Sequence, residues 1–145
     1  MVIEKTVHIH SHIDKVWKTF IDLTCWVNWN TVLKDVKCTG DQCLMEGTSF
    51  SCRVDPYDIA VNFTANVEEV IPKKRVVWSA RKFGISAHHE FTFEEIDNEV
   101  RVTSREVLSG LPVIVPPLFF PGGEIRKMTQ KLLWDLKEAA EAGLP

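Results

Sequence analysis

The stretch SHIDKVWKTFIDLTCWVNW, residues 11–29, decides the fold of this chain. Ser11 is followed three residues later by Asp14, which is the spacing of a capping box. In such a box a hydroxyl accepts from an orphan backbone N–H, and an acidic side chain faces the positive end of the helix dipole. We therefore expect Ser11 to cap a helix over residues 13–22. A second short helical piece over residues 23–29 follows it.

On both sides of this stretch, apolar and polar residues alternate with the period of half-buried strands. One such segment precedes the two short helices, and six follow them. Turn residues such as Pro56, Gly84 and Asn98 separate these segments. We expect strands over residues 2–10, 35–39, 48–55, 59–68, 76–80, 87–93 and 100–108.

Residues 124–142 are the one long amphipathic segment of the chain, and their spacing predicts a helix of about five turns. Consecutive strands without a parallel crossover unit pair antiparallel, and a twisted sheet of seven strands curls. The sequence therefore predicts an α+β fold, in which a seven-stranded curved antiparallel sheet wraps around a long C-terminal helix. Two short helices lie between strands 1 and 2. The helical stripe that covers the sheet is Ile125, Met128, Leu132, Leu136 and Ala139.

Length and composition indicate one domain, residues 1–145. Of these residues 45% are hydrophobic and 26% are charged, which suffices for a sizeable core. The net charge is −3 and basic residues are scattered, so nucleic acid is not an expected partner. The longest apolar stretch, residues 111–120, is too short for a membrane span and contains three prolines. Because no signal segment precedes the first strand, we expect a cytoplasmic protein.

The cysteine pattern predicts reduced thiols. Cys25, Cys38, Cys43 and Cys52 include no CxxC pair, and the chain shows no export signal. Cys38 and Cys43 flank a short loop, which leaves a metal site or a disulfide there as an alternative. The cysteine spacing is not specific enough to assign a metal or another cofactor, so we expect none.

The histidine spacing raises one further metal hypothesis. His8, His10 and His12 occupy every second position, which on a continuing strand would place three imidazoles on one side, as zinc requires. The strand should however end by Ser11, which turns His12 away. We therefore interpret these histidines as part of a solvated strand face.

Short motifs along most of the chain carry a family resemblance. They are Val16-Trp17, Trp26-Val27-Asn28-Trp29-Asn30, Glu46-Gly47-Thr48, Val67-Glu68-Glu69-Val70-Ile71-Pro72, Val76-Val77-Trp78, His88-His89-Glu90-Phe91, Arg101-Val102-Thr103 and residues 133–141. With the order of the elements, they resemble the START-related (SRPBCC) superfamily, which includes lipid-transfer domains, polyketide cyclases and birch-pollen-allergen-like proteins. The resemblance implies the helix-grip fold. His12 departs from it, because a proline usually opens the helix there, and so does Pro-Gly-Gly at residues 121–123.

The resemblance also implies a pocket between the sheet and the last helix that holds a lipid, a polyketide or a similar hydrophobic small molecule. The protein would then act as a carrier or sensor. Alternation along the strands places the expected lining on their inner faces, with Trp78 as the leading candidate. The expected ligand-binding residues are Phe50, Cys52, Phe63, Ala65, Val67, Val76, Trp78, Ala87, His89, Phe91, Val102, Ser104, Glu106, Phe119, Ile125, Met128 and Leu132.

Two of these residues, His89 and Glu106, leave a catalytic hypothesis open. An imidazole beside a partly desolvated carboxylate can shuttle protons in an aldol cyclisation or a dehydration, as a polyketide cyclase requires. The structural alternative is that His89 hydrogen-bonds Ser104, Thr129 or a buried water.

A third hypothesis is a protein-binding or chaperone-associated module. It would present the outer face of the sheet, or Phe119 and Phe120, to its partner, as some relatives in the superfamily do with chaperones. The sequence leaves the oligomeric state open.

Overall fold

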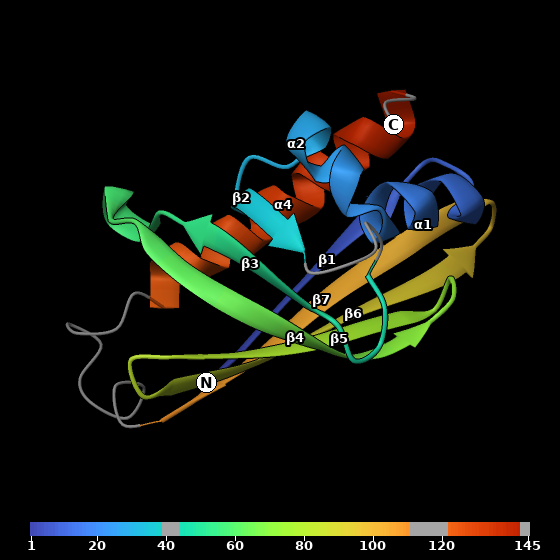
Figure 1. Cartoon of the computed structure of the whole chain (residues 1–145). Coiled ribbons are helices and arrows are strands. Elements are labelled where there is room, and N and C mark those ends of the chain that lie inside the picture. Colours follow the sequence, from blue (N-terminus) through green and yellow to red (C-terminus); the bar gives the residue numbers. More distant parts are fainter. Residues whose placement is uncertain (39–43, 111–121, 143–145) are drawn as a thin grey trace.

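The computed structural model describes residues 1–38, 44–110 and 122–142, and Figure 1 shows how the elements are arranged. One curved sheet holds all the strands, and a long helix crosses its concave side. In chain order the elements are β1 (Val2–Ile9), α1 (Ile13–Ile21), the 3-10 turn η1 (Leu23–Cys25), α2 (Trp26–Trp29), β2 (Lys34–Cys38), β3 (Ser49–Val54), the 3-10 turn η2 (Pro56–Asp58), β4 (Val61–Ile71), β5 (Arg75–Lys82), β6 (Ile85–Ile96), β7 (Glu99–Ser109) and α4 (Gly122–Ala142).

The sheet has seven strands in the order β1-β7-β6-β5-β4-β3-β2, and each neighbouring pair is antiparallel. The predicted α+β helix-grip fold is therefore confirmed, together with the two short helices between the first two strands. Gly84 lies in the tight turn that joins β5 to β6, where its φ of +77° suits a residue without Cβ. No helix within the described ranges is long and apolar enough to cross a membrane.

The start of α1 differs from the prediction. The helix begins at Ile13, so the capping position falls on His12 instead of Ser11. The backbone of His12 is extended, and its Nδ1 accepts a hydrogen bond from the Asp14 N–H at 3.3 Å. The Asp14 carboxylate turns outward and pairs with Lys73 in the turn between β4 and β5, which lowers the pKa of that carboxyl. An imidazole therefore replaces the predicted hydroxyl as the cap.

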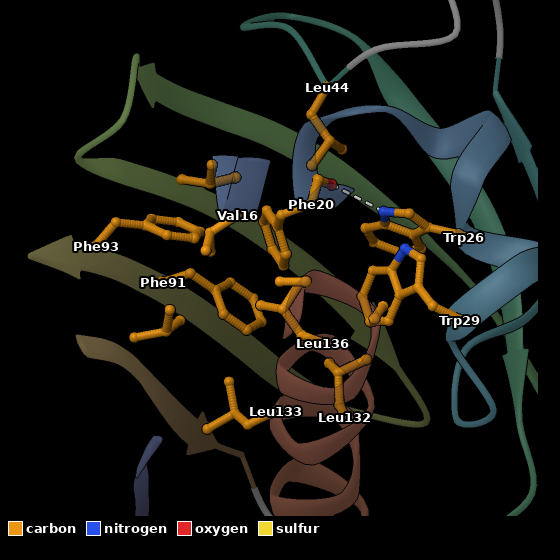
Figure 2. Close-up of a cluster of buried hydrophobic side chains, with 14 of the residues drawn as sticks. Val16, Phe20, Trp26, Trp29, Leu44, Phe91, Phe93, Leu132, Leu133 and Leu136 are labelled. Atoms are coloured by element: carbon orange, nitrogen blue, oxygen red, sulfur yellow. Dashed lines mark hydrogen bonds between the residues drawn. The ribbon is translucent and has the colours of Figure 1, made fainter. Parts of the chain in front are cut away.

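The tryptophan segment after α1 closes the end of that helix. The last four carbonyls of a helix have no partner within the helix and must find one elsewhere. In α1 two of them accept from indole N–H groups of α2, as Figure 2 shows for one, and two accept from backbone N–H groups. The four pairs are Lys18 O with Asp22 N (3.3 Å), Thr19 O with Trp29 Nε1 (3.1 Å), Phe20 O with Trp26 Nε1 (2.8 Å) and Ile21 O with Leu44 N (2.9 Å).

The main hydrophobic core lies where α1, α2 and the C-terminal part of α4 meet the concave face of the sheet (Figures 1 and 2). Phe20 is at its centre and is only 1% exposed. The Phe20 ring lies 4.8 Å from that of Phe91 and 5.3 Å from that of Phe93, between centroids. Trp78 stacks parallel to Phe20 at 6.1 Å. Aromatic rings therefore fill this end of the fold.

Polar contacts hold the C-terminal part of α4 in place. Lys137 donates to the backbone carbonyl of His8 at 2.6 Å, and Glu141 accepts from the backbone N–H of His10 at 2.9 Å. Asp135, although buried, accepts from the backbone N–H of Thr31 at 3.0 Å. These contacts tie the helix to β1 and to the segment that follows α2.

We expect Asp135→Ala to lower the free energy of unfolding by about 1–3 kcal/mol, because it leaves the Thr31 N–H and hydroxyl without their acceptor. Lys131→Ala is the matched control on the same helix, since the Lys131 side chain is 59% exposed and contributes only an ion pair to Asp135. Its loss should cost less than about 1 kcal/mol. Urea unfolding of the two variants measures both values, and equal losses would contradict the structural role of the Thr31 contact.

Candidate functional site

Three alanines lie in one line across the inner face of the sheet. Ala65 on β4 is opposite Ala80 on β5, and Ala80 is opposite Ala87 on β6. We call this line the alanine row. Phe50 on β3 and Leu108 on β7 continue it at its two ends. Because an alanine side chain stops at Cβ, the row leaves more room above the sheet than the aromatic side chains beside it.

The inner face is tightly packed at one end and partly exposed at the other. Near α1 and α2, residues such as Phe91 and Val102 are fully buried. Within the alanine row Ala65 is fully buried, whereas Ala80 and Ala87 keep partial exposure, and so do further apolar side chains on this face. The helix follows this pattern, because the buried residues of α4 begin at Thr129, apart from Gly122. The half-buried residues, called the open end below, are Val61, Phe63, Ala80, Ile85, Ala87, Ile125 and Met128.

Next to the alanine row, three polar side chains of β6 and β7 form a connected group. His89 and Glu106 are directly opposite each other in the sheet, with His89 Nδ1 3.4 Å from Glu106 Oε2. His89 Nε2 lies 2.6 Å from Ser104 Oγ, so that Ser104 is its partner among the three considered. The imidazole also stacks on Phe91, with 4.2 Å between ring centroids. The alternation of each strand predicted that His89 and Glu106 share the inner face, and the register of β6 and β7 places them next to each other.

Burial controls the protonation of this pair. It lowers the pKa of His89 to about 3, with a further contribution from the charge of His88, and it raises the pKa of Glu106 to about 7. Both shifts favour the uncharged form, because a charge is costly to desolvate. In a neutral His89 with its proton on Nδ1, that N–H points toward the Glu106 carboxyl, and Nε2 accepts from the Ser104 hydroxyl. Both side chains are therefore uncharged between about pH 3 and pH 7.

Removing either partner should reveal the titration of the other. In Glu106→Gln, His89 remains, and between about pH 3 and 6.5 the unfolded state binds more protons than the folded state. The free energy of unfolding should therefore rise with pH in that window. In His89→Gln, Glu106 remains, and between about pH 4.5 and 7 the folded state binds more protons. Here the free energy of unfolding should fall as pH rises.

Each slope approaches about 1.4 kcal/mol per pH unit where one group differs by a full proton between the two states. In the unmodified protein the two slopes oppose each other between about pH 4.5 and 6.5, so its stability should stay nearly level there. Urea unfolding at about pH 5 and pH 6 measures all three proteins. Parallel profiles for the two variants would show that burial does not perturb the pair as described.

Thr129 is the polar residue that α4 contributes to this region. Its neighbours one helical turn away on the same stripe are Ile125, which packs against Leu108 and Ile3, and Leu133 in the main core. From this spacing we expect Thr129 to lie between Leu108 and the main core, at the level of Glu106 on β7. It is buried, and no hydrogen bond joins its hydroxyl to another described residue. His89, Ser104, Glu106 and Thr129 are called the polar cluster below.

The predicted lining residues divide between the two ends of the inner face. Phe63, Ala87, Ile125 and Met128 belong to the open end. Trp78 lies in the packed end, with its ring 5.2 Å from that of Phe50. Phe119 lies outside the described residues. The lining residues that are buried, besides His89, are Phe50, Cys52, Ala65, Val67, Val76, Trp78, Phe91, Val102, Ser104 and Leu132.

Four site residues were missing from the predicted lining: Val61, Ala80, Ile85 and Thr129. The signal for Ala80 is its position two residues after Trp78 on the same strand face. Thr129 was harder to find, because the stripe of the covering helix was traced through apolar residues alone. Its signal is the helical spacing of four residues from Ile125.

Surface hollows lined by described residues include four that do not border Trp78, His89 or Glu106, although one of them, of about 180 Å³, borders Met128 of the open end. One, of about 490 Å³, lies over charged and threonine side chains of β1, β6 and β7 on the outer face. Another, of about 710 Å³, lies between the helical segment before β2 and β2 itself. The site is therefore defined by the open end and the polar cluster, not by these hollows.

The histidine and cysteine hypotheses have separate outcomes. His12 caps α1, and His10 pairs with Glu99 at 2.8 Å, so the three alternating histidines do not converge. Within the described ranges, no group of three or more His, Cys, Asp or Glu side chains is placed to hold a metal ion. Cys25 and Cys52 are buried free thiols, and burial raises the pKa of Cys52 to about 12. Cys43 lies outside the described residues.

Comparisons with known proteins agree with this architecture. The family model described as "Activator of Hsp90 ATPase homolog 1-like protein" matches residues 10–130. A hypothetical protein from Helicobacter pylori has a similar structure, with a TM-score of 0.80 and 19% identity over 97% of this chain and 88% of that one. The Aha1 dimer from Colwellia psychrerythraea has a TM-score of 0.73 and 17% identity over 99% of this chain and 98% of that one. A START superfamily protein from Mycobacterium smegmatis has a TM-score of 0.71 and 11% identity over 99% of this chain and 96% of that one. No curated protein matches the chain.

Proposed function

The chain belongs to the family of Activator of Hsp90 ATPase homolog 1-like proteins, within the START-like superfamily, and from this premise we propose that it binds a hydrophobic small molecule between the sheet and α4 as a carrier or sensor. The alanine row is the observation that carries the proposal. At Ala80 and Ala87, which keep partial exposure, the row lines the inner face with small side chains, and the continuously buried stripe of α4 begins only at Thr129.

The chemistry of the open end fits an apolar guest. Small-molecule sites are concave and mostly apolar, with few polar groups that fix orientation. The open end offers aliphatic and aromatic side chains from three strands and one helix, and the polar cluster borders it on one side. Covering these half-buried side chains would remove apolar surface from water, which contributes about 25 cal/mol for each Å². A lipid or a polyketide presents the complementary surface.

Solvent extraction of the purified protein, followed by mass spectrometry, tests the proposal. We expect an apolar compound in an amount comparable to the protein, and we expect the emptied protein to bind the neutral dye Nile red. Protein that yields no such compound and does not raise Nile red fluorescence would refute the proposal. Unfolded protein analysed in parallel controls for non-specific uptake of both.

A second candidate function is that of a cyclase or dehydratase, and the contact between His89 and Glu106 supports it. Glu106, with its pKa raised to about 7, suits a general acid near neutral pH. His89 is a weak base, because burial holds its pKa near 3 and Nε2 is already bonded to Ser104. Catalysis therefore ranks behind carriage. Loss of polyketide turnover in His89→Gln, with ligand binding retained, would reverse this order.

The family description supports the third hypothesis, a chaperone-associated module, because it names activators of the Hsp90 ATPase. The relevant measurement is the ATPase rate of an Hsp90 chaperone with and without this protein. An increase in that rate would favour a protein partner, and an unchanged rate would remove the hypothesis. The extraction experiment is independent of this result.

A further inference from the structure

The alanine row and the polar cluster are adjacent on one face, and we infer that the bound molecule carries an uncharged oxygen, as a ketone or a hydroxyl group, that hydrogen-bonds Glu106 while its apolar body covers the alanine row. This inference rests on the proposed function and adds the chemical class of the ligand. Three features carry it: the spacing of the two groups, the free hydrogen-bonding capacity of the cluster, and the absence of an ion pair between Glu106 and a lysine or arginine among the described residues.

The spacing follows from the register of the sheet. His89 is two residues beyond Ala87 on β6, and Glu106 is two residues before Leu108 on β7, all facing inward. Two residues along a strand span about 7 Å. A ligand whose hydrocarbon part lies over Ala80 and Ala87 therefore brings a group attached to its chain within reach of the Glu106 carboxyl.

The cluster has hydrogen-bonding capacity that the described residues do not use. Ser104 and both ring nitrogens of His89 are engaged with one another or with Glu106. The Glu106 carboxyl contacts only His89 among these residues, and its side chain keeps 15% exposure. The Thr129 hydroxyl makes no hydrogen bond within the described ranges, and its oxygen is not among the fully buried atoms that lack a partner. Both groups are therefore accessible to a ligand oxygen.

The charges near Glu106 select against an ionised ligand. Glu106 makes no ion pair with a lysine or arginine among the described residues, and burial raises its pKa. Lys5, opposite Ser104 on β1, makes no ion pair with Glu106. A ligand carboxylate would therefore be buried beside an acidic group without a counter-ion, which is costly. A ligand amine would require a desolvated ion pair, which often gives no net stabilisation. A neutral carboxyl instead donates to a carbonyl or hydroxyl oxygen.

Competitive displacement of Nile red tests the inference with five compounds of equal chain length: methyl octyl ketone, decanol, decanoate, decylamine and decane. At about pH 6 Glu106 is mostly protonated. We expect the ketone and the alcohol to displace the dye at concentrations about tenfold lower than decane or decanoate, as one buried hydrogen bond predicts. Decylamine should resemble decanoate. In Glu106→Leu the concentrations of ketone and alcohol that displace the dye should lie within about twofold of that of decane. Glu106→Gln keeps a donor and should retain part of the preference for ketone and alcohol.

Thr129→Val is the second variant, because it removes the hydroxyl and keeps the shape of the side chain. Thr129→Val should weaken the binding of the ketone and the alcohol relative to that of decane, without changing the concentration of decane that displaces the dye. Urea unfolding of each variant shows that it is folded. A preference for decanoate or decylamine, or a preference for ketone that survives in Glu106→Leu, would overturn the inference. Displacement by all five compounds alike would overturn the inference and leave the proposed function standing, whereas failure of the protein to bind Nile red would overturn both.

Discussion

Phe20→Ala is expected to lower the free energy of unfolding by about 3–5 kcal/mol, the usual cost when a buried phenylalanine is truncated to alanine. Its ring touches those of Phe91, Phe93, Trp26 and Trp78, so the cavity would be surrounded by rigid aromatic side chains that relax poorly. Figure 2 shows this ring between α1, the sheet and Leu136 of α4. Urea unfolding, with the slope against denaturant fitted for each protein, measures the change.

Phe83→Ala is the matched control for this prediction, since it makes the same chemical change at a side chain that is 73% exposed. Its expected effect is within about 0.5 kcal/mol. If both variants lost the same stability, the aromatic cluster would not be the principal core of the fold. If Phe20→Ala kept its stability with a steeper or shallower denaturant slope, the two-state comparison would fail instead.

Ala87→Phe should weaken Nile red binding about tenfold or more, because its ring would occupy the room above the alanine row. Ala87 is half-buried, so the added ring can enter the open end, and overpacking should cost no more than about 1–3 kcal/mol of stability. Equilibrium titration with Nile red measures the effect.

His88→Phe is the control for this variant. It places the same ring on the next residue of β6, whose side chain is exposed on the outer face of the sheet. Dye binding should be unchanged there. If both variants and the unmodified protein bound Nile red with the same affinity, the protein would bind the dye at a place other than the alanine row.

Much of the fold follows from short-range patterns in the sequence. Alternation identified every strand, and the spacing of apolar residues identified α1 and α4, because these periods report directly which face is buried. The cap of α1 was assigned one residue too early. Ser11 has the usual chemistry of a cap, but the helix begins at Ile13, and the imidazole of His12 meets the same requirement.

The candidate site depends on register, which alternation alone does not give. That His89 and Glu106 share a face follows from counting along each strand, and this part was predictable. That three alanines align across β4, β5 and β6 requires the pairing of those strands, including the irregularity between Val67 and Glu69 that shifts β4 against β5. An inserted residue of this kind leaves little trace in a single sequence. The alanine row was therefore visible only in the assembled sheet.

The carbonyl end of α1 has a consequence for how the protein opens. A helix of nine residues is too short to persist alone in water, and its terminal acceptors depend on Trp26, Trp29 and Leu44, which belong to other segments. If α1 frayed alone, the two indole N–H groups would lose their carbonyl acceptors while still buried away from water. The helix and the tryptophans must therefore detach in a single cooperative step. Backbone amides of α1 should accordingly be among the slowest in the molecule to exchange their hydrogens with solvent.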